Sequence, residues 1–172
     1  MQKIVPNNRS KLMNNDDFIV SKTDLKGNIT YCNEIFIKYS GYSENELLGK
    51  PHNIIRHPDM PKVIFHLLWE RIKNKQEIFA YVNNLSADGS NYWVYANVTA
   101  SVDSKDNVIG YYSVRRKPTD SALKQIDTLY KTLLEKEKKG GLDASKKYLN
   151  DLLENKEVSY DEFVNYLQNG DA

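Results

Sequence analysis

Hydrophobic and polar residues alternate over two short stretches near the start of the chain and over three longer ones in its middle. This pattern predicts strands over residues 18–23, 28–31, 79–85, 92–102 and 108–116. Between the second and third strands the hydrophobic period becomes helical, and helix-start signals occur at Asn33, Ser43 and Pro61. Two strands, several short helices and three antiparallel strands form an α+β order.

The composition shifts to Lys, Glu, Leu and Asp after Pro118, and leucines recur there at helical intervals. Gly140 and Gly141 are expected to break this helical segment in two, and the Ser159–Glu162 capping box predicts a further helix. A short polar arm precedes the first strand. We therefore predict an arm over 1–15, a central domain over 16–118 and a C-terminal helical extension over 119–172.

Charge and cysteine content exclude several classes of protein. The 172 residues include 24 Lys and Arg against 23 Asp and Glu, so no strong field attracts nucleic acid. A single cysteine, Cys32, excludes an internal disulfide and a multi-cysteine zinc site. The longest nearly apolar stretch, 63–69, is too short for a membrane helix, and no signal peptide is recognisable. We expect a soluble, cytoplasmic protein without direct membrane insertion.

The segment 51–61 is unusual because it combines three prolines with two histidines, an arginine and an aspartate. His52, His57 and Asp59 match no standard metal-ligand spacing. A hydrolytic triad lacks the Gly-x-Ser-x-Gly elbow. Arg56 and His57 suit an anion site better, because a guanidinium binds phosphate in a planar fork. Residue types alone favour a fourth interpretation, a polar loop held by an Arg56–Asp59 contact or by hydrogen bonds between a histidine and a backbone carbonyl.

Other candidates lie on the predicted helix and strands. His66 allows a haem interpretation, because one axial imidazole suffices, although a lone helical histidine is more often structural. Alternation places Ala80, Val82 and Asn84 on one strand face. An inward Asn84 needs hydrogen-bond partners, which a planar ligand or a neighbouring backbone group would supply. Glycine-rich phosphate-binding motifs do not occur, which disfavours a nucleotide-powered enzyme.

The whole pattern resembles a known family over residues 15–120. General PAS-domain features are Asn33-x-x-Phe36, Gly41-Tyr-Ser43, Glu46-Leu-Leu-Gly49, Asp88-Gly89 and Tyr92-Trp93. More specific features are the block 49–61, Trp69, Ala96-Asn-Val-Thr99 and the segment 109–115. Together they resemble the flavin-binding PAS domains of aerotaxis, or energy-taxis, receptors. The resemblance implies a PAS fold: a five-stranded antiparallel sheet with short helices on one face and non-covalent FAD between them.

The resemblance also implies the residues of a cofactor site, without catalytic residues or a metal. Positions that match flavin-linked positions of the family are Arg56, His57, Asp59 and Trp69. Asn84 corresponds to the amide that faces the pyrimidine edge of flavin, and Arg115 to a polar residue of the last strand that senses flavin protonation. The blue-light cysteine motif does not occur, so we expect no photoadduct.

The function implied by the resemblance is redox sensing for energy taxis without catalytic turnover. The family's membrane helices and signalling coil do not follow residue 120, so the chain is expected to be a separate sensory subunit. Its expected partner is a membrane-anchored chemotaxis receptor, through which it associates with the membrane, and a homodimer is a further option. Alternatives are FMN in place of FAD, a haem gas sensor that uses His66 or His57, a small flavin reductase, and a ligand-free interaction or dimerisation module.

Overall fold

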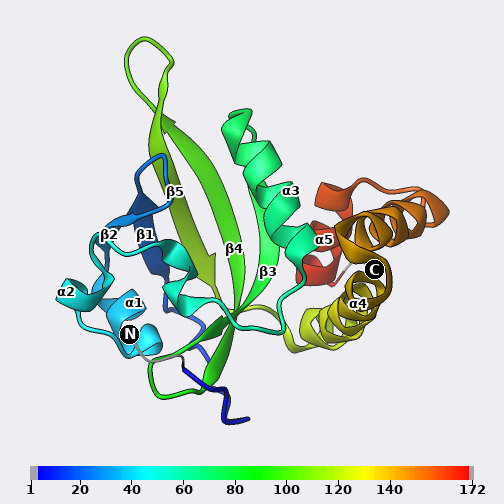
Figure 1. The fold of residues 1–172 in the computed structure, drawn as a ribbon, viewed down its shortest axis with the longest axis horizontal. Helices are drawn as coiled ribbons and strands as arrows, with labels where there is room; N and C mark the ends of the chain where they lie inside the picture. The colour runs from blue at the N-terminus through cyan, green and yellow to red at the C-terminus, as the bar shows by residue number, and fades with distance from the viewer. Residues whose placement is uncertain (1–3, 171–172) are drawn as a thin grey trace.

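The computed structural model describes residues 4–170. Its centre is a five-stranded antiparallel sheet in the order β2–β1–β5–β4–β3 (Figure 1). The strands are β1 (Ile19–Thr23), β2 (Ile29–Cys32), β3 (Ile78–Leu85), β4 (Asn91–Val102) and β5 (Val108–Arg116). Every strand end lies within one residue of its predicted position, which confirms the α+β fold.

Short helices cover one face of the sheet (Figure 1). They are α1 (Glu34–Ser40), α2 (Glu44–Leu47), the 3₁₀ turn η1 (His52–Ile55) and α3 (Lys62–Lys73). The Asn33 side chain accepts a hydrogen bond from the Phe36 amide, and Ser43 forms the predicted capping box. Pro61 lies one position before α3 rather than in its first turn, because its ψ of 133° is extended.

The C-terminal extension consists of α4 (Asp120–Asn155) and α5 (Tyr160–Asn169). The predicted break inside α4 is a sharp kink, at which Gly140 and Gly141 leave the helical conformation. The two halves of α4 fold against each other there, since the Ser145 hydroxyl donates to Glu137 across the kink at 3.1 Å. Gly141 has φ 69° and ψ −164°, a conformation that is essentially restricted to glycine.

The extension packs on the outer face of β3 and β4 and reaches α3 around the edge strand β3 (Figure 1). The Tyr130 hydroxyl donates to the Tyr81 carbonyl at 2.6 Å, and the Tyr81 hydroxyl donates to the Val164 carbonyl at 3.1 Å. Tyr81 alternates along β3 with Ala80 and Val82, which face the other way. The sheet therefore separates most of the extension from its inner face.

The described part of the N-terminal arm lies along the turn between β3 and β4. The Asn7 amide donates to the Gly89 carbonyl at 2.9 Å, and the Lys11 amide donates to the Asn91 carbonyl at 2.8 Å. Residues 1–3 of the predicted arm and residues 171–172 of the predicted extension lie outside the described residues.

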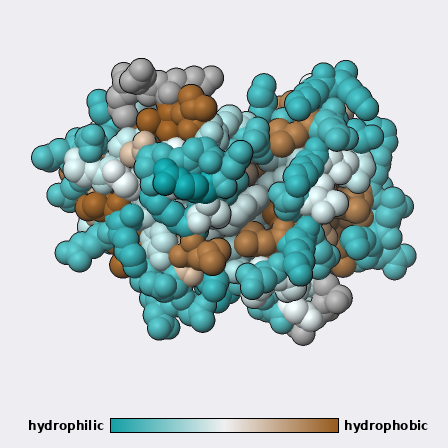
Figure 2. Space-filling model, turned by 90° about the horizontal axis from the view of Figure 1, so that it is seen from below, coloured by the Kyte–Doolittle hydropathy of each residue, from teal (hydrophilic) through white to brown (hydrophobic). Residues whose placement is uncertain are grey.

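The surface seen from below is largely hydrophilic, with hydrophobic residues in small, separate groups (Figure 2). Within residues 4–170, no helix combines the length and the apolar character that spanning a lipid bilayer requires.

Candidate functional site

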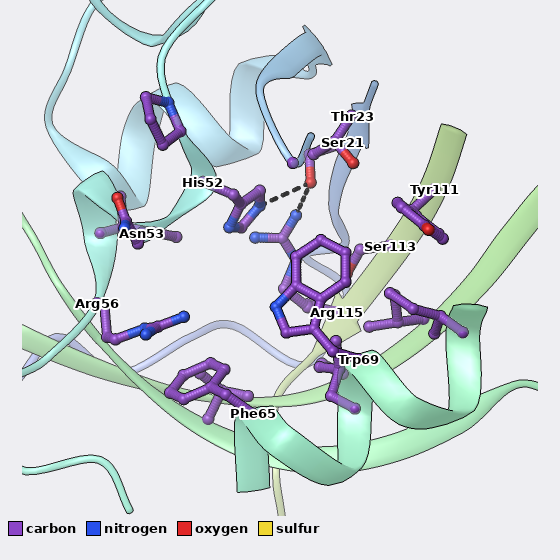
Figure 3. Close-up of a pocket in the computed structure, with 18 of the residues that line it drawn as sticks. Ser21, Thr23, His52, Asn53, Arg56, Phe65, Trp69, Tyr111, Ser113 and Arg115 are labelled. Carbon is purple, nitrogen blue, oxygen red and sulfur yellow. Dashed lines mark hydrogen bonds between the residues drawn. The ribbon is translucent and has the colours of Figure 1, made fainter. Parts of the chain in front are cut away.

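A cavity of about 210 Å³ lies between the inner face of the sheet and the helical segment that covers it (Figure 3). Strands β1, β3, β4 and β5 form its floor, while α3 and the segment 51–56 form its other walls. The predicted Pro-rich block and the predicted inward strand face therefore meet at one place.

The α3 wall is apolar and aromatic. Phe65, Leu68, Trp69 and Ile72 line the cavity at helical spacing. The Trp69 indole lies so close to Gly27 that a Cβ atom added there would be 3.2 Å from the ring. Gly27 also has a φ of 82°, so the turn between β1 and β2 favours glycine twice over.

Two buried side chains present unpartnered hydrogen-bond donors at this cavity. Asn84 is 4% exposed, and its Nδ2 has no partner among the residues that the structure describes. Arg115 is 3% exposed, and its Nε and Nη1 lack partners, while Nη2 donates to the Ser21 hydroxyl. A buried donor left unpaired costs about 1–3 kcal/mol. The arrangement fits a bound molecule that carries acceptor atoms.

Ser21 joins Arg115 to His52. The Ser21 Oγ lies 3.1 Å from the His52 Nε2, and the imidazole stacks on the Phe36 ring at 5.7 Å between centroids. Burial, together with the charges of Arg115 and Arg56, lowers the pKa of His52 to about 3. The imidazole is therefore neutral at physiological pH and can hold Ser21 without adding charge.

Arg56 lies at the edge of the cavity, where its guanidinium carbon is 3.7 Å from the centre of the Phe65 ring (Figure 3). Burial lowers the pKa of Arg56. Its backbone forms a β-bridge with Asn84, which ties the Pro-rich segment to β3. Arg56 and Asp59, although both described, form no ion pair, so this one of the two contacts considered for a structural loop is absent.

The six predicted site residues separate into two groups. Arg56, Trp69, Asn84 and Arg115 line the cavity together. His57 and Asp59 do not line it: His57 is buried beside the loop and accepts a hydrogen bond from the Asp59 amide, and the Asp59 carboxyl is exposed.

The sequence analysis did not identify Ser21. Alternation along β1 places Ser21 between Ile19 and Thr23 on the inner face, and a small polar residue at that position was the available signal.

Charge in the cavity has one sign. Lys26, Arg56 and Arg115 line it, whereas none of its described lining residues is an aspartate or glutamate. The His66 imidazole, considered above for haem, lies outside the lining and within 3.8 Å of the Glu70 carboxylate. Across residues 4–170, no group of three or more His, Cys, Asp or Glu side chains forms a metal-binding cluster. The site thus suits a planar, acceptor-rich or anionic molecule.

Sequence comparisons connect this chain to a bacterial receptor and a bacterial regulatory protein. The chain is 40% identical over 118 residues to the Aerotaxis receptor of Escherichia coli (strain K12), covering 69% of the chain and 23% of that receptor. It is 27% identical over 97 residues to the Nitrogen fixation regulatory protein of Klebsiella pneumoniae, covering 56% and 20%. The chain therefore spans less than a quarter of the length of either relative.

Solved structures share the fold. The dark structure of the blue-light photoreceptor Aureochrome1 LOV matches with a TM-score of 0.59 and 22% identity, covering 64% of this chain and 82% of that one. A Light-Oxygen-Voltage domain studied with a flavin analogue matches with a TM-score of 0.57 and 21% identity, covering 67% and 86%. A family model described as the PAS fold matches residues 29–115, half of the chain. The chain belongs to the PAS-fold family.

Proposed function

We propose that this chain is a redox sensor for aerotaxis or energy taxis and that its cofactor is FAD. The observation that carries the proposal is the cavity, which combines an aromatic wall with three unpartnered buried donors on Asn84 and Arg115. The relative named Aerotaxis receptor and the solved LOV domains support a flavin in this position.

The residues present fit the isoalloxazine ring of a flavin. Its pyrimidine edge carries carbonyl oxygens and ring nitrogens, which would accept from the Asn84 amide and the Arg115 guanidinium. Its flat surface would pack against the apolar side chains of α3, such as Leu68 and Trp69. A cavity of about 210 Å³ is smaller than a typical small-molecule site. The phosphates and adenine of FAD would therefore extend outward, where Lys26 and Arg56 offer positive charge.

The positive charge at the cavity suits a sensor that responds to the redox state of a bound flavin. A bound flavin would supply reversible electron acceptance, and the reduced ring carries more negative charge near its pyrimidine edge. Arg115 has no counter-ion among residues 4–170 and would interact more strongly with that reduced ring. Asn84 can then exchange donor and acceptor roles only by turning its amide. We place the switch at these two side chains.

The output we propose is binding to a membrane-anchored chemotaxis receptor, from a cytoplasmic position and without catalytic turnover. The similarity to the relative named Aerotaxis receptor supports an output in taxis. A second copy of the chain is a further candidate partner.

An absorption spectrum of the purified protein tests the cofactor. We expect flavin bands that dithionite bleaches, and heat should release FAD rather than FMN. A Soret band would instead indicate haem, steady NADH consumption would indicate a reductase, and a colourless protein that does not take up added FAD would contradict the proposal.

The affinity for a chemotaxis-receptor cytoplasmic region, measured with oxidised and reduced protein, tests the output. Equal affinities in the two states would refute signalling through this contact.

A further inference from the structure

The helix that forms the cavity wall receives its N-terminal cap from the C-terminal extension. The Glu137 carboxylate of α4 accepts hydrogen bonds from the amides of Lys62 and Val63, at 3.1 and 3.0 Å. Pro61, the local cap position of α3, provides no side-chain acceptor. A carboxylate at this point also interacts favourably with the positive end of the helix dipole. The first turn of α3 therefore depends on a residue 75 positions later in the chain.

The kink in α4 sets the position of that carboxylate. Ser145 lies beyond the kink and is fully buried, and its hydroxyl shares its proton between the Leu142 carbonyl at 2.9 Å and the Glu137 Oε1 at 3.1 Å. Lys136, the neighbour of Glu137, lies with its Nζ 5.3 Å from the centre of the Tyr148 ring, which also belongs to the second half of α4. The two halves of α4 must thus remain folded together for Glu137 to cap α3.

The extension also holds α3 near its other end and the strand opposite. Arg71 of α3 forms an ion pair with Asp161 of α5 at 2.8 Å. The Tyr130 hydroxyl binds the Tyr81 carbonyl of β3, the strand that carries Asn84. Contacts at positions 62 and 71 are nine residues apart, about 13 Å along the helix. The extension therefore holds α3 at two points and β3 at a third, although no cavity-lining residue comes from α4 or α5.

We infer that the C-terminal extension is an allosteric clamp, in which Glu137 is a positioning residue that keeps α3 in the place required for ligand binding. The inference rests on the proposed function, because its ligand is the flavin. A flavin that packs against α3 and an extension that caps α3 both act on the position of one rigid helix. Binding linkage is reciprocal, so the flavin must also stabilise the docked extension. The extension thereby becomes the part of the chain that reports cavity occupancy to the exterior.

Equilibrium binding of FAD to flavin-stripped protein tests the clamp. We expect Glu137→Ala to raise the FAD Kd at least five-fold, within the usual range of allosteric coupling. The matched control is Glu135→Ala, an exposed glutamate two residues earlier on the same helix, which should change the Kd less than two-fold. Asp161→Asn, which removes only the ion pair with Arg71, should raise the Kd about two-fold and serves if Glu137→Ala does not fold.

Amide hydrogen exchange supplies a second readout, which a merely structural role would not change. In the wild type, FAD should slow exchange at the Lys62 and Val63 amides and throughout 142–155. In Glu137→Ala the slowing at 142–155 should be lost while that of β5 remains. A wild type that does not bind FAD contradicts the proposed function. A wild type that binds FAD, with an unchanged or lower Kd in Glu137→Ala and Asp161→Asn, overturns the clamp alone.

Discussion

Replacing Arg115 by methionine should affect the cofactor-free and the flavin-bound protein in opposite directions. Burial lowers the pKa of Arg115 from 12.5 to about 10, and at 1.36 kcal/mol per pKa unit this difference corresponds to about 3 kcal/mol against the charged side chain. Two unpartnered donors at about 1–3 kcal/mol each give a cost of the same size. Both routes identify Arg115 as a source of instability while the cavity lacks a ligand.

The substitution also removes favourable contacts. The hydrogen bond to Ser21 contributes about 1 kcal/mol, and the guanidinium carbon lies 4.8 Å from the Phe36 ring centre, a cation–π contact of about 0.5–1 kcal/mol. The remaining gain is about 1 kcal/mol. Cofactor-free Arg115→Met should therefore melt about 2–4 °C higher than the wild type. Its FAD Kd should be about ten-fold higher, because a hydrogen bond from a charged group is lost.

Urea unfolding of stripped protein, followed by tryptophan fluorescence, measures the first effect, and FAD titration measures the second. The control is Arg116→Met, the same exchange at the next, exposed residue of β5, which should change neither quantity appreciably. A flavin-free Arg115→Met that is less stable than the wild type would show that the guanidinium is satisfied without a ligand. That result would refute the conclusion that the buried charge of Arg115 destabilises the cofactor-free protein.

Three further outcomes are expected. The pKa of His52 is about 3 in the folded protein against an ordinary 6.5, so the unfolded chain takes up the proton first and stability falls as pH drops below about 6.5. Urea unfolding at pH 6.5 and 4.5 should show a loss of up to about 1.4 kcal/mol per pH unit from this residue, and His52→Gln should reduce that slope; an unchanged slope would mean that another group titrates. Burial lowers the pKa of His57 as well, so its contribution has the same sign and is separated by His57→Gln. Gly141→Ala should destabilise the protein by about 1–3 kcal/mol in urea unfolding, because its φ of 69° and ψ of −164° suit only glycine; equal stability would indicate that the kink can relax. Gly27→Ala should cost about 1–2 kcal/mol and shift the Trp69 fluorescence, since φ is 82° and the new methyl group would contact the indole; an unaltered emission spectrum would contradict this contact.

The strands were predictable because each alternates clearly and ends at a recognisable turn. The same alternation placed Asn84 on the inner face, where the structure has it. By contrast, the contact of Ser21 with Arg115 depends on the pairing of β1 with β5, in which Ser21 faces Ser113 and Ile19 faces Arg115. No local pattern specifies that register across more than 90 residues.

In the Pro-rich segment, residue types alone do not predict which side chains line the cavity. Arg56, His57 and Asp59 were equally available for chemistry, yet only Arg56 lines the cavity. The β-bridge between Arg56 and Asn84 fixes this choice, because it aligns the loop with β3 and leaves the Asp59 carboxyl in solvent. Such a bridge is a tertiary contact, and neither loop composition nor helical period predicts it.

The N-terminal cap of α3 comes from Glu137 of α4, and this has a consequence for biosynthesis. When Lys62 is added to the nascent chain, its capping carboxylate has not yet been made, and 75 further residues must be added to reach Glu137. At roughly 5–20 residues per second this interval is about 4–15 s. During that time the nascent sheet can form while the first turn of α3 stays uncapped. The wall of the cavity is thus completed only after Glu137 has been synthesised, so we expect cofactor loading to follow that point.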